Sequence, residues 1–171
     1  MGDPNMTPKT QRYLADRRPP TPCLVVDLDV VRANYLKLKR ELPVADVYYA
    51  VKANPARPVL DLLVGLGAHF DAASLQEVEA CLAAGGRADK ISFGNTVKKH
   101  ADIAGAFAHG VGLFAFDSEA ELVKLSQAAP GAKVSAPLLH VKSVPPPAWL
   151  TVAEPNAGGP SATGLTMTGD R

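Results

Sequence analysis

The sequence predicts an α/β fold in which parallel strands alternate with helices. Short runs rich in β-branched and aromatic residues begin near positions 46, 68, 90, 112 and 133, at intervals of 21 or 22 residues. Apolar residues recur at helical spacing between these runs, and each helical stretch ends at glycine or proline. Such regular alternation implies parallel strands joined by right-handed crossovers.

Two architectures fit this alternation. A doubly wound open sheet is the simpler arrangement for so few units, whereas a complete (β/α)8 barrel normally needs about 250 residues. The periodicity does not decide between a small open sheet and part of a barrel.

An amphipathic helix opens the domain and precedes the first strand. Asp27 or Asp29 can cap its N-terminus, and Pro43 follows its end. The apolar run DVYYAV at 46–51 is then predicted to be a buried strand that ends at the turn ANP. A second helix over 58–66 stops at Gly67. Apolar positions at helical spacing in the first helix are Val31, Tyr35, Leu38 and Leu42, and those in the second are Val59, Leu62, Leu63 and Leu66.

The strand-helix unit then recurs along the chain. The strands AHFDAA, KISFGN and VGLFAFD each precede a helical stretch, and these helices are predicted to end at Gly85 and Gly86, at Gly110, and at Pro130 and Gly131. A fifth strand begins near 133. Proline, glycine, serine and threonine dominate the chain beyond it, and three consecutive prolines exclude a helix there. We therefore predict an N-terminal extension at 1–20, one domain at 21–136 and an irregular or disordered tail at 137–171.

The composition indicates a globular domain with a small-molecule partner. Of 171 residues, 47% are hydrophobic, which is enough for one core. The formal charge of +1 does not indicate binding to nucleic acid or to a membrane surface. No apolar run approaches the roughly 20 residues that span a bilayer, so a cytoplasmic location is expected.

The cysteine and histidine residues do not form a recognisable metal or disulfide pattern. Cys23 and Cys81 lie far apart in the sequence, so two reduced and mostly buried thiols are expected. The histidines lack the spacing of metal ligands, so no metal site is expected. They are His69, His100, His109 and His140.

Functional residues are sought where the strands end, because ligands of parallel α/β sheets bind at the carboxyl ends of the strands. These positions hold Lys52, Asp71, Asn95 and Asp117. Lys52 follows the apolar run VYYAV, and a lysine desolvated there could form a Schiff base with an aldehyde. Alternatively, its side chain extends from the strand end to solvent. Position alone leaves both interpretations open.

Two S-x-x-E sequences offer a purely structural explanation for several acidic residues. Residues 74–77 read SLQE and form a capping box, which accounts for Glu77 without a ligand. The sequence SEAE repeats that pattern, so Asp117, Ser118 and Glu121 are most simply helix-start residues.

Five consecutive motifs carry a family resemblance. From about Thr21 to Lys133 the chain resembles the fold-type III pyridoxal-phosphate-dependent basic amino-acid decarboxylases, and the ornithine decarboxylases above all. The motifs are TPCLVVDLDVVRANY, VYYAVKANP, LGAHFDAASLQEVEACLAAG, ISFGNTVKKHADI and GVGLFAFDSEAELVKL.

The resemblance implies a fold and a cofactor site. The fold would be the first four to five units of an alanine-racemase-like (β/α)8 barrel. Lys52 in YAVKAN would bind pyridoxal 5′-phosphate, and Asp71 and Glu77 would lie close to that cofactor. Asn95 matches the asparagine that ends the third strand, although threonine follows it where proline is frequent. Full-length members of the family form homodimers.

The chain also departs from the family pattern. VSAPLL at 134–139 contains no arginine where the family has one, and the stacking histidine, the glycine-rich phosphate loop, the EPGR motif and the C-terminal β-domain are absent. We therefore expect a truncated or frame-shifted chain with little activity alone, derived from an enzyme that decarboxylates L-ornithine to putrescine. Diaminopimelate or lysine decarboxylation, or a non-catalytic regulatory homologue, are the alternatives.

Overall fold

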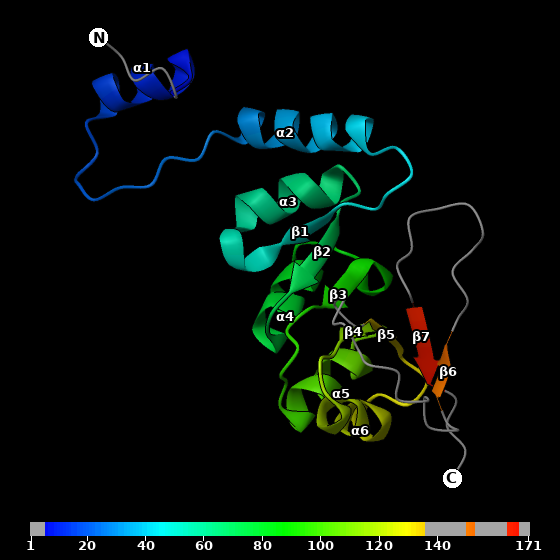
Figure 1. Ribbon diagram of the computed structural model, residues 1–171. Coiled ribbons are helices and arrows are strands. Elements are labelled where there is room, and N and C mark those ends of the chain that lie inside the picture. The colour runs from blue at the N-terminus through cyan, green and yellow to red at the C-terminus, as the bar shows by residue number, and fades with distance from the viewer. Residues whose placement is uncertain (1–5, 136–149, 153–163, 168–171) are drawn as a thin grey trace. The chain divides into compact units, whose positions relative to one another are not determined.

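The computed structural model describes residues 6–135, 150–152 and 164–167 (Figure 1). Residues Met1–Ala45 and Asp46–Arg171 form two compact units, here called the N-terminal unit and the sheet unit. The domain boundaries expected from the sequence, after 20 and after 136, stay predictions.

The N-terminal unit contains helices α1 (Pro8–Arg17) and α2 (Leu28–Glu41). The Thr7 hydroxyl caps α1 by accepting a hydrogen bond from the Thr10 amide, and it donates to the Asp27 carboxylate at 2.8 Å. Asp27 in turn caps α2 by accepting from the Asp29 amide. The capping residue of α2 is thus one of the two predicted, whereas α1 was not predicted. Helix α1 begins with a proline, which suits the first helical position because its missing N–H would have no partner there.

The sheet unit is built on five parallel strands that follow the chain order. Every strand begins within two residues of its predicted position. The strands are β1 (Tyr48–Ala50), β2 (His69–Ala72), β3 (Ile91–Phe93), β4 (Leu113–Ala115) and β5 (Lys133–Ser135). The α-helices between them are α3 (Arg57–Gly65), α4 (Leu75–Ala83), α5 (His100–Ala108) and α6 (Glu119–Ala128), and two short 3-10 turns are η1 (Val51–Ala53) and η2 (Ala88–Lys90).

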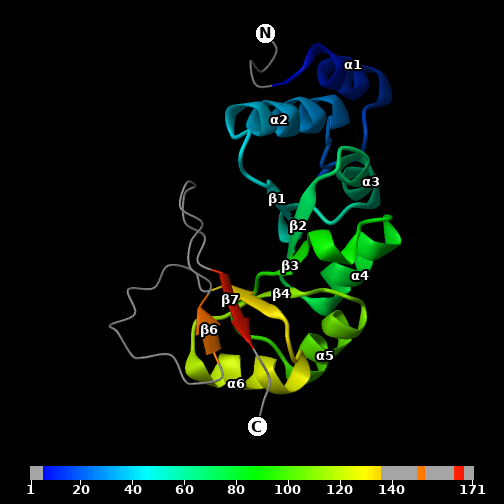
Figure 2. The same cartoon turned by 90° about the vertical axis from the view of Figure 1, so that its right-hand side faces the viewer.

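The strand order distinguishes between the two predicted architectures. A doubly wound sheet reverses direction at some strand, but β1 to β5 are added consecutively with no reversal. Right-handed crossovers in one direction place all helices on one face, and Figure 2 shows α3–α6 on the same side of the strands. This is the arrangement of part of a barrel.

The core lies between the sheet and these helices. In β2 to β5, alternate strand residues point toward the helices and are at most 1% exposed, including Phe70, Phe93, Phe114 and Val134. The other face carries residues of intermediate exposure and, on β5, the exposed Lys133. On that face the strand register places side by side Ala50, Asp71, Ser92, Leu113 and Lys133.

Two antiparallel strands extend the sheet beyond β5. Strand β7 (Gly164–Met167) pairs with β5, and β6 (Leu150–Val152) pairs with β7. The prediction of an irregular tail was wrong for these two segments. Strands β6 and β7 have only three and four residues, which is too short for a recognisable alternation of apolar and polar residues. The prolines and glycines around them indicated irregular structure instead. The remaining positions of the tail lie outside the described residues.

Helix ends agree with the sequence pattern. Helix α3 ends two residues before Gly67, whose φ of 76° lies in the left-handed region that glycine adopts without strain. Glycines with positive φ also follow α4, α5 and α6. In α2, however, Tyr35 alone of the predicted apolar face is buried, and Leu38 and Leu42 are 44% and 47% exposed.

Candidate functional site

Lys52 lies in η1, directly after β1. Fully buried Val51 anchors this turn, and the Tyr49 hydroxyl donates to the Asn54 carbonyl oxygen at 3.1 Å. The Asn54 side chain accepts from the Ala56 amide at 3.0 Å, which leads the chain into α3. The turn therefore fixes the backbone of Lys52 at the carboxyl end of the first strand.

The Lys52 side chain is exposed. Of the two interpretations that its position after VYYAV left open, the structure therefore agrees with a side chain that extends from the strand end to solvent, and not with a desolvated amine. Within the part of the chain that the structure describes, the amine forms no hydrogen bond or ion pair. The amine of Lys52 interacts electrostatically with the carboxylate of Asp71. This attraction favours the ionised form of the Asp71 carboxyl.

Asp71 lies on β2, on the sheet face that the helices leave open. It pairs in register with Ala50 of β1 and with Ser92 of β3. Burial raises the pKa of the Asp71 carboxyl, while a hydrogen bond from Ser92 and the charge of Lys52 oppose this shift and the charge of Glu77 adds to it. Asp71 thus interacts electrostatically with Lys52 and with Glu77, the other two predicted site residues.

Gly94 provides the space that Asp71 occupies. A β-carbon at position 94 would overlap the Asp71 carboxylate. The Gly94 amide donates to the Ala72 carbonyl oxygen at 2.8 Å, so that β2 and β3 stay paired at this point. The sequence did not single out this glycine, because its role depends on a residue of the neighbouring strand.

Glu77 lies in the first turn of α4, as the predicted capping box requires. The Ser74 hydroxyl accepts from the Glu77 amide at 3.2 Å, and the Glu77 carboxylate accepts from the Ala73 amide at 2.7 Å. In a standard box the glutamate binds the amide of the capping residue itself, one position later. Glu77 therefore has a structural role, and contact with a cofactor stays a prediction.

The other two strand-end residues are less closely associated with Lys52. The Asn95 side chain is exposed, and its backbone carbonyl accepts from Lys98 Nζ at 2.9 Å. Asp117 is exposed and directly precedes Ser118, the capping residue of α6. Asp117 thus has the helix-start position that was predicted.

Glu121 has a role that the sequence did not reveal. Ser118 caps α6 by accepting from the Glu121 amide at 3.3 Å, as predicted. The Glu121 side chain, however, is 2% exposed and lies between two lysines, 2.8 Å from Lys98 Nζ and 2.5 Å from Lys124 Nζ. The predicted helix-start position of Glu121 is therefore confirmed, but its side chain has an additional role that was not predicted. Lys98 and Glu121 are buried, whereas the side chain of Lys124 is 34% exposed; we call the three residues the ion cluster.

Burial and pairing act in opposite directions on the pKa values of this cluster. Burial lowers the pKa of Lys98, although the hydrogen bond and charge of Glu121 oppose that shift. Burial alone would raise the pKa of Glu121, but its bonds with Lys124 and Lys98 outweigh this effect and the pKa falls below its usual value. Glu121 is therefore held as a carboxylate.

Among the described cysteine and histidine residues, none contacts Lys52 or Asp71. Cys81 is buried on α4, and burial together with the charge of Glu77 raises its pKa to about 11. Cys23 is exposed, so the prediction of mostly buried thiols is wrong for it. The His69 ring packs on Tyr48 at 4.9 Å, and His140 lies outside the described residues. In the described part of the chain, no three histidine, cysteine or acidic residues are grouped to hold a metal.

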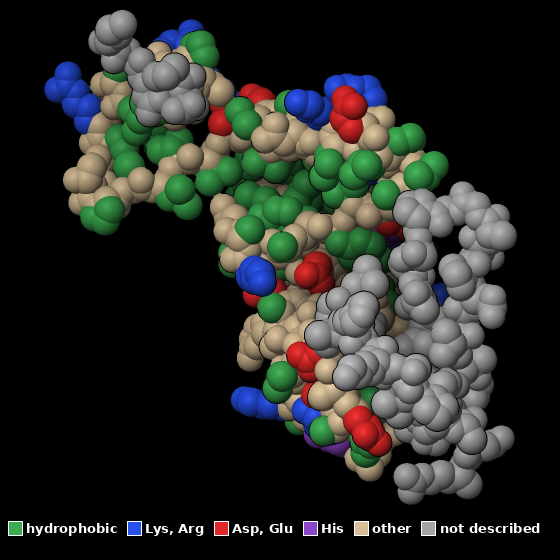
Figure 3. All heavy atoms as spheres, in the orientation of Figure 1, with side chains coloured by type: hydrophobic (Ala, Val, Ile, Leu, Met, Phe, Trp, Pro, Cys, Tyr) green, Lys and Arg blue, Asp and Glu red, His purple; other side chains and the backbone are tan. Residues whose placement is uncertain are grey.

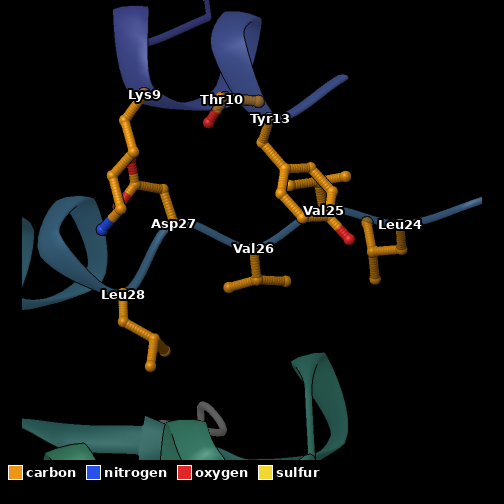
Figure 4. A pocket seen from close by; sticks show the side chains of 8 residues that line it. All are labelled: Lys9, Thr10, Tyr13, Leu24, Val25, Val26, Asp27 and Leu28. Atoms are coloured by element: carbon orange, nitrogen blue, oxygen red, sulfur yellow. The ribbon is translucent and has the colours of Figure 1, made fainter. Parts of the chain in front are cut away.

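The N-terminal unit contains a separate cavity of about 400 Å³ (Figure 4). Its charged groups are already paired, because Lys9 lies 2.5 Å from Asp29 and 3.4 Å from Asp27. Hydrophobic side chains are also visible on the surface over α2 (Figure 3). The cavity is lined by Lys9, Thr10, Tyr13, Leu24, Val25, Val26, Asp27 and Leu28.

Residues 28–144 match the family model described as the pyridoxal-binding domain of the pyridoxal-dependent decarboxylases. The lysine/ornithine decarboxylase of Selenomonas ruminantium is 43% identical over 118 residues, which are 69% of this chain and 30% of that protein. Antizyme inhibitor 2 of Xenopus laevis is 36% identical over 64% of this chain and 24% of its own length.

A crystal structure of the Selenomonas ruminantium lysine decarboxylase is similar in fold. It superimposes with a TM-score of 0.69 at 41% identity, over 77% of this chain and 34% of that one. The chain thus spans about a quarter to a third of the length of these proteins. No described helix is both long and apolar enough to cross a membrane.

Proposed function

Because this chain belongs to the pyridoxal-dependent decarboxylase family, we propose that it is part of an enzyme that decarboxylates a basic amino acid with pyridoxal 5′-phosphate held at Lys52. The observation that carries the proposal is the exposed amine of Lys52 at the carboxyl end of β1, which has no hydrogen bond or ion pair with any described residue and whose charge acts on the Asp71 carboxyl. Ligands of parallel α/β barrels bind at this edge.

The side chains at this edge fit an aldehyde cofactor. An aldehyde requires a primary amine with a free electron pair and room to react. Lys98, by contrast, is also at this edge but donates to the Asn95 and Ala115 carbonyl oxygens and to Glu121. The amine of Lys52 is therefore the better candidate of these two lysines.

Pyridoxal phosphate, when bound, supplies an electron sink for the electron pair that remains when carbon dioxide departs. The amine of Lys52 would hold the cofactor reversibly, so that the amine of a substrate can replace it. Once replaced, Lys52 Nζ would be available to carry a proton at the edge of the sheet where the Asp71 carboxylate also lies. Glu77 would keep the start of α4 in place beside this site.

We propose L-ornithine as the substrate, which would yield putrescine and carbon dioxide. The support is the likeness of FDAAS and FDSE to the ornithine decarboxylases and the 43% identity to a protein called lysine/ornithine decarboxylase. L-lysine, one methylene longer, is the first alternative, and diaminopimelate is the second. A homodimer in the cytoplasm is proposed for the complete enzyme.

A non-catalytic regulatory role is a second candidate function. It is favoured by the 36% identity to a protein named antizyme inhibitor 2 rather than decarboxylase. The presence of Lys52 favours the catalytic function, because a function that consists only of binding a partner does not require an amine at this position.

The test restores a complete barrel. Residues 1–135 joined to the remaining part of the Selenomonas ruminantium enzyme are expected to release carbon dioxide from ornithine, whereas the 171-residue chain alone should release none above background. Lys52→Ala in the joined protein should lower kcat at least about a hundredfold, as expected when a group that carries a proton is lost. Lys99→Ala, an exposed lysine, is the control. Unchanged turnover of the Lys52→Ala protein would refute the proposal.

A further inference from the structure

We propose that Lys98 is a positioning residue for the cofactor site. Through Asn95 and Gly94 it would hold the loop between β3 and α5 against the carboxylate of Asp71, at the carboxyl edge of the sheet where Lys52 also lies. The inference rests on the proposed function, since it concerns the geometry around the same amine.

The Lys98 amine is completely engaged. Its side chain is fully buried, and its three N–H groups have three acceptors. These are the Asn95 carbonyl oxygen at 2.9 Å, the Ala115 carbonyl oxygen at 2.5 Å and Glu121 Oε1 at 2.8 Å. The cation thus ties the loop after β3 to the end of β4 and to the start of α6.

Glu121 anchors this arrangement from α6. Its Oε1 also accepts from the Lys98 backbone amide at 3.1 Å, and its Oε2 pairs with Lys124, which donates in turn to the Lys98 carbonyl oxygen. Both the side chain and the backbone of Lys98 are therefore fixed. The segment from Gly94 to Lys98 is held at its far end by four contacts with neighbouring elements.

The near end of the same segment contacts Asp71. Gly94 leaves the space that the Asp71 carboxylate occupies, and its amide is bonded to Ala72 of β2. Gly94 and Asn95 are consecutive, so a displacement of the Asn95 carbonyl moves Gly94 as well. A loop released from Lys98 would therefore shift the wall against which Asp71 packs.

A purely stabilising role is the competing explanation, and the two can be separated. Replacing both members of a buried ion pair by apolar residues of similar size is often neutral for stability, whereas removing one member is costly. Lys98→Met/Glu121→Leu should therefore fold with a melting temperature near that of the wild type, but it lacks the bonds from Lys98 to Asn95 and Ala115. In the single variant Lys98→Met, Lys124 still neutralises Glu121.

The first measurement is the site of cofactor attachment in the 171-residue chain. Pyridoxal phosphate is added, the product is fixed with borohydride, and peptide mapping gives the share of label on Lys52. We expect that share to fall about tenfold in both variants, because small displacements of a positioning group cost large factors. Lys99→Met, which alters an exposed lysine beside Lys98, is the matched control and should retain the wild-type share.

The second measurement needs no cofactor. Carbon-detected titration of Asp71 should show its raised pKa moving toward the ordinary value in both variants, since a displaced loop admits water to the carboxylate. A folded double variant with the wild-type label share and the wild-type Asp71 titration would overturn the inference. Should the double variant fail to fold, the same outcome in Lys98→Met would overturn it.

The labelling experiment gives a different result if Lys52 does not hold the cofactor. In that case the wild-type chain would not concentrate the label on Lys52, which removes the cofactor site and this inference together. If the wild type does label Lys52, the two variants alone decide the role of Lys98.

Discussion

The carboxylate of Asp71 packs against the α-carbon of Gly94, in the volume that any side chain at position 94 would fill. Asp71 lies on β2 and Gly94 directly follows β3, whose Ser92 also donates a hydrogen bond to Asp71. The strands β2 and β3 can thus approach each other near their carboxyl ends because Gly94 has no β-carbon.

Gly94→Ala should destabilise the chain by about 1–3 kcal/mol, the usual cost of inserting a methyl group where no space exists. The new β-carbon must displace either Asp71 or the loop after β3. Urea unfolding measures this effect. Gly112→Ala is the matched control, because a β-carbon at position 112 meets no atom within 4 Å. Equal losses in the two variants would contradict the role of the Asp71 contact.

Asp71→Asn should stabilise the chain at neutral pH. Burial raises the pKa of Asp71 in the folded state, so ionisation of this group opposes folding at pH values above that pKa. The gain should be below about 1 kcal/mol, because the half-exposed carboxyl is screened by solvent.

The stabilisation by Asp71→Asn should depend on pH, in a direction set by the raised pKa of Asp71. As the pH falls through the raised pKa of Asp71, the wild-type carboxyl becomes neutral like the amide, and the advantage of asparagine should disappear. Urea unfolding of both proteins at pH 7 and at about pH 3.5 measures the difference, and other acidic groups cancel in the comparison. A difference that grows on acidification would show that the pKa shift has the opposite sign.

Ser74→Ala should cost about 1 kcal/mol, the usual loss for a helix cap. The Ser74 hydroxyl accepts from the Glu77 amide at the start of α4, which has no partner within the helix. Ser126→Ala is the control, since Ser126 lies within α6 and its hydroxyl only donates to the Val123 carbonyl oxygen. Thermal unfolding of the two variants compares them directly. A smaller loss for Ser74→Ala than for Ser126→Ala would contradict the capping role.

The periodic part of the fold was predictable because each unit is defined by local signals. Strand starts near 68, 90 and 112 lie one residue before those observed, and Gly67 follows α3 as expected. Helix α1 was missed, since only Tyr13 and Leu14 are large apolar residues in it and no periodic stripe results. The partial barrel itself was inferred from the resemblance, and the strand order then agreed with it.

The candidate site was predictable in part for the same reason. Lys52 and Asp71 stand at strand ends, which can be located from the sequence. Lys98 and Glu121 were not identified as partners, because they are 23 residues apart and their contact exists only once β3, β4 and α6 are assembled. The pair Glu121 and Lys124, at i and i+3, has the spacing of an ordinary surface ion pair, and nothing local indicates its burial.

The antiparallel pairing of β7 with β5 has a consequence for barrel closure. A repeated strand-helix barrel grows by adding each new strand parallel to the last, at the free edge. In this chain the hydrogen-bonding groups of Val134 and its neighbours on that edge are already matched with Leu165 and the residues beside it. A sixth parallel strand could reach β5 only by exchanging with β7. Completion of the barrel would thus be a competition between two strands of opposite direction for one row of donors and acceptors, not a simple extension of the sheet.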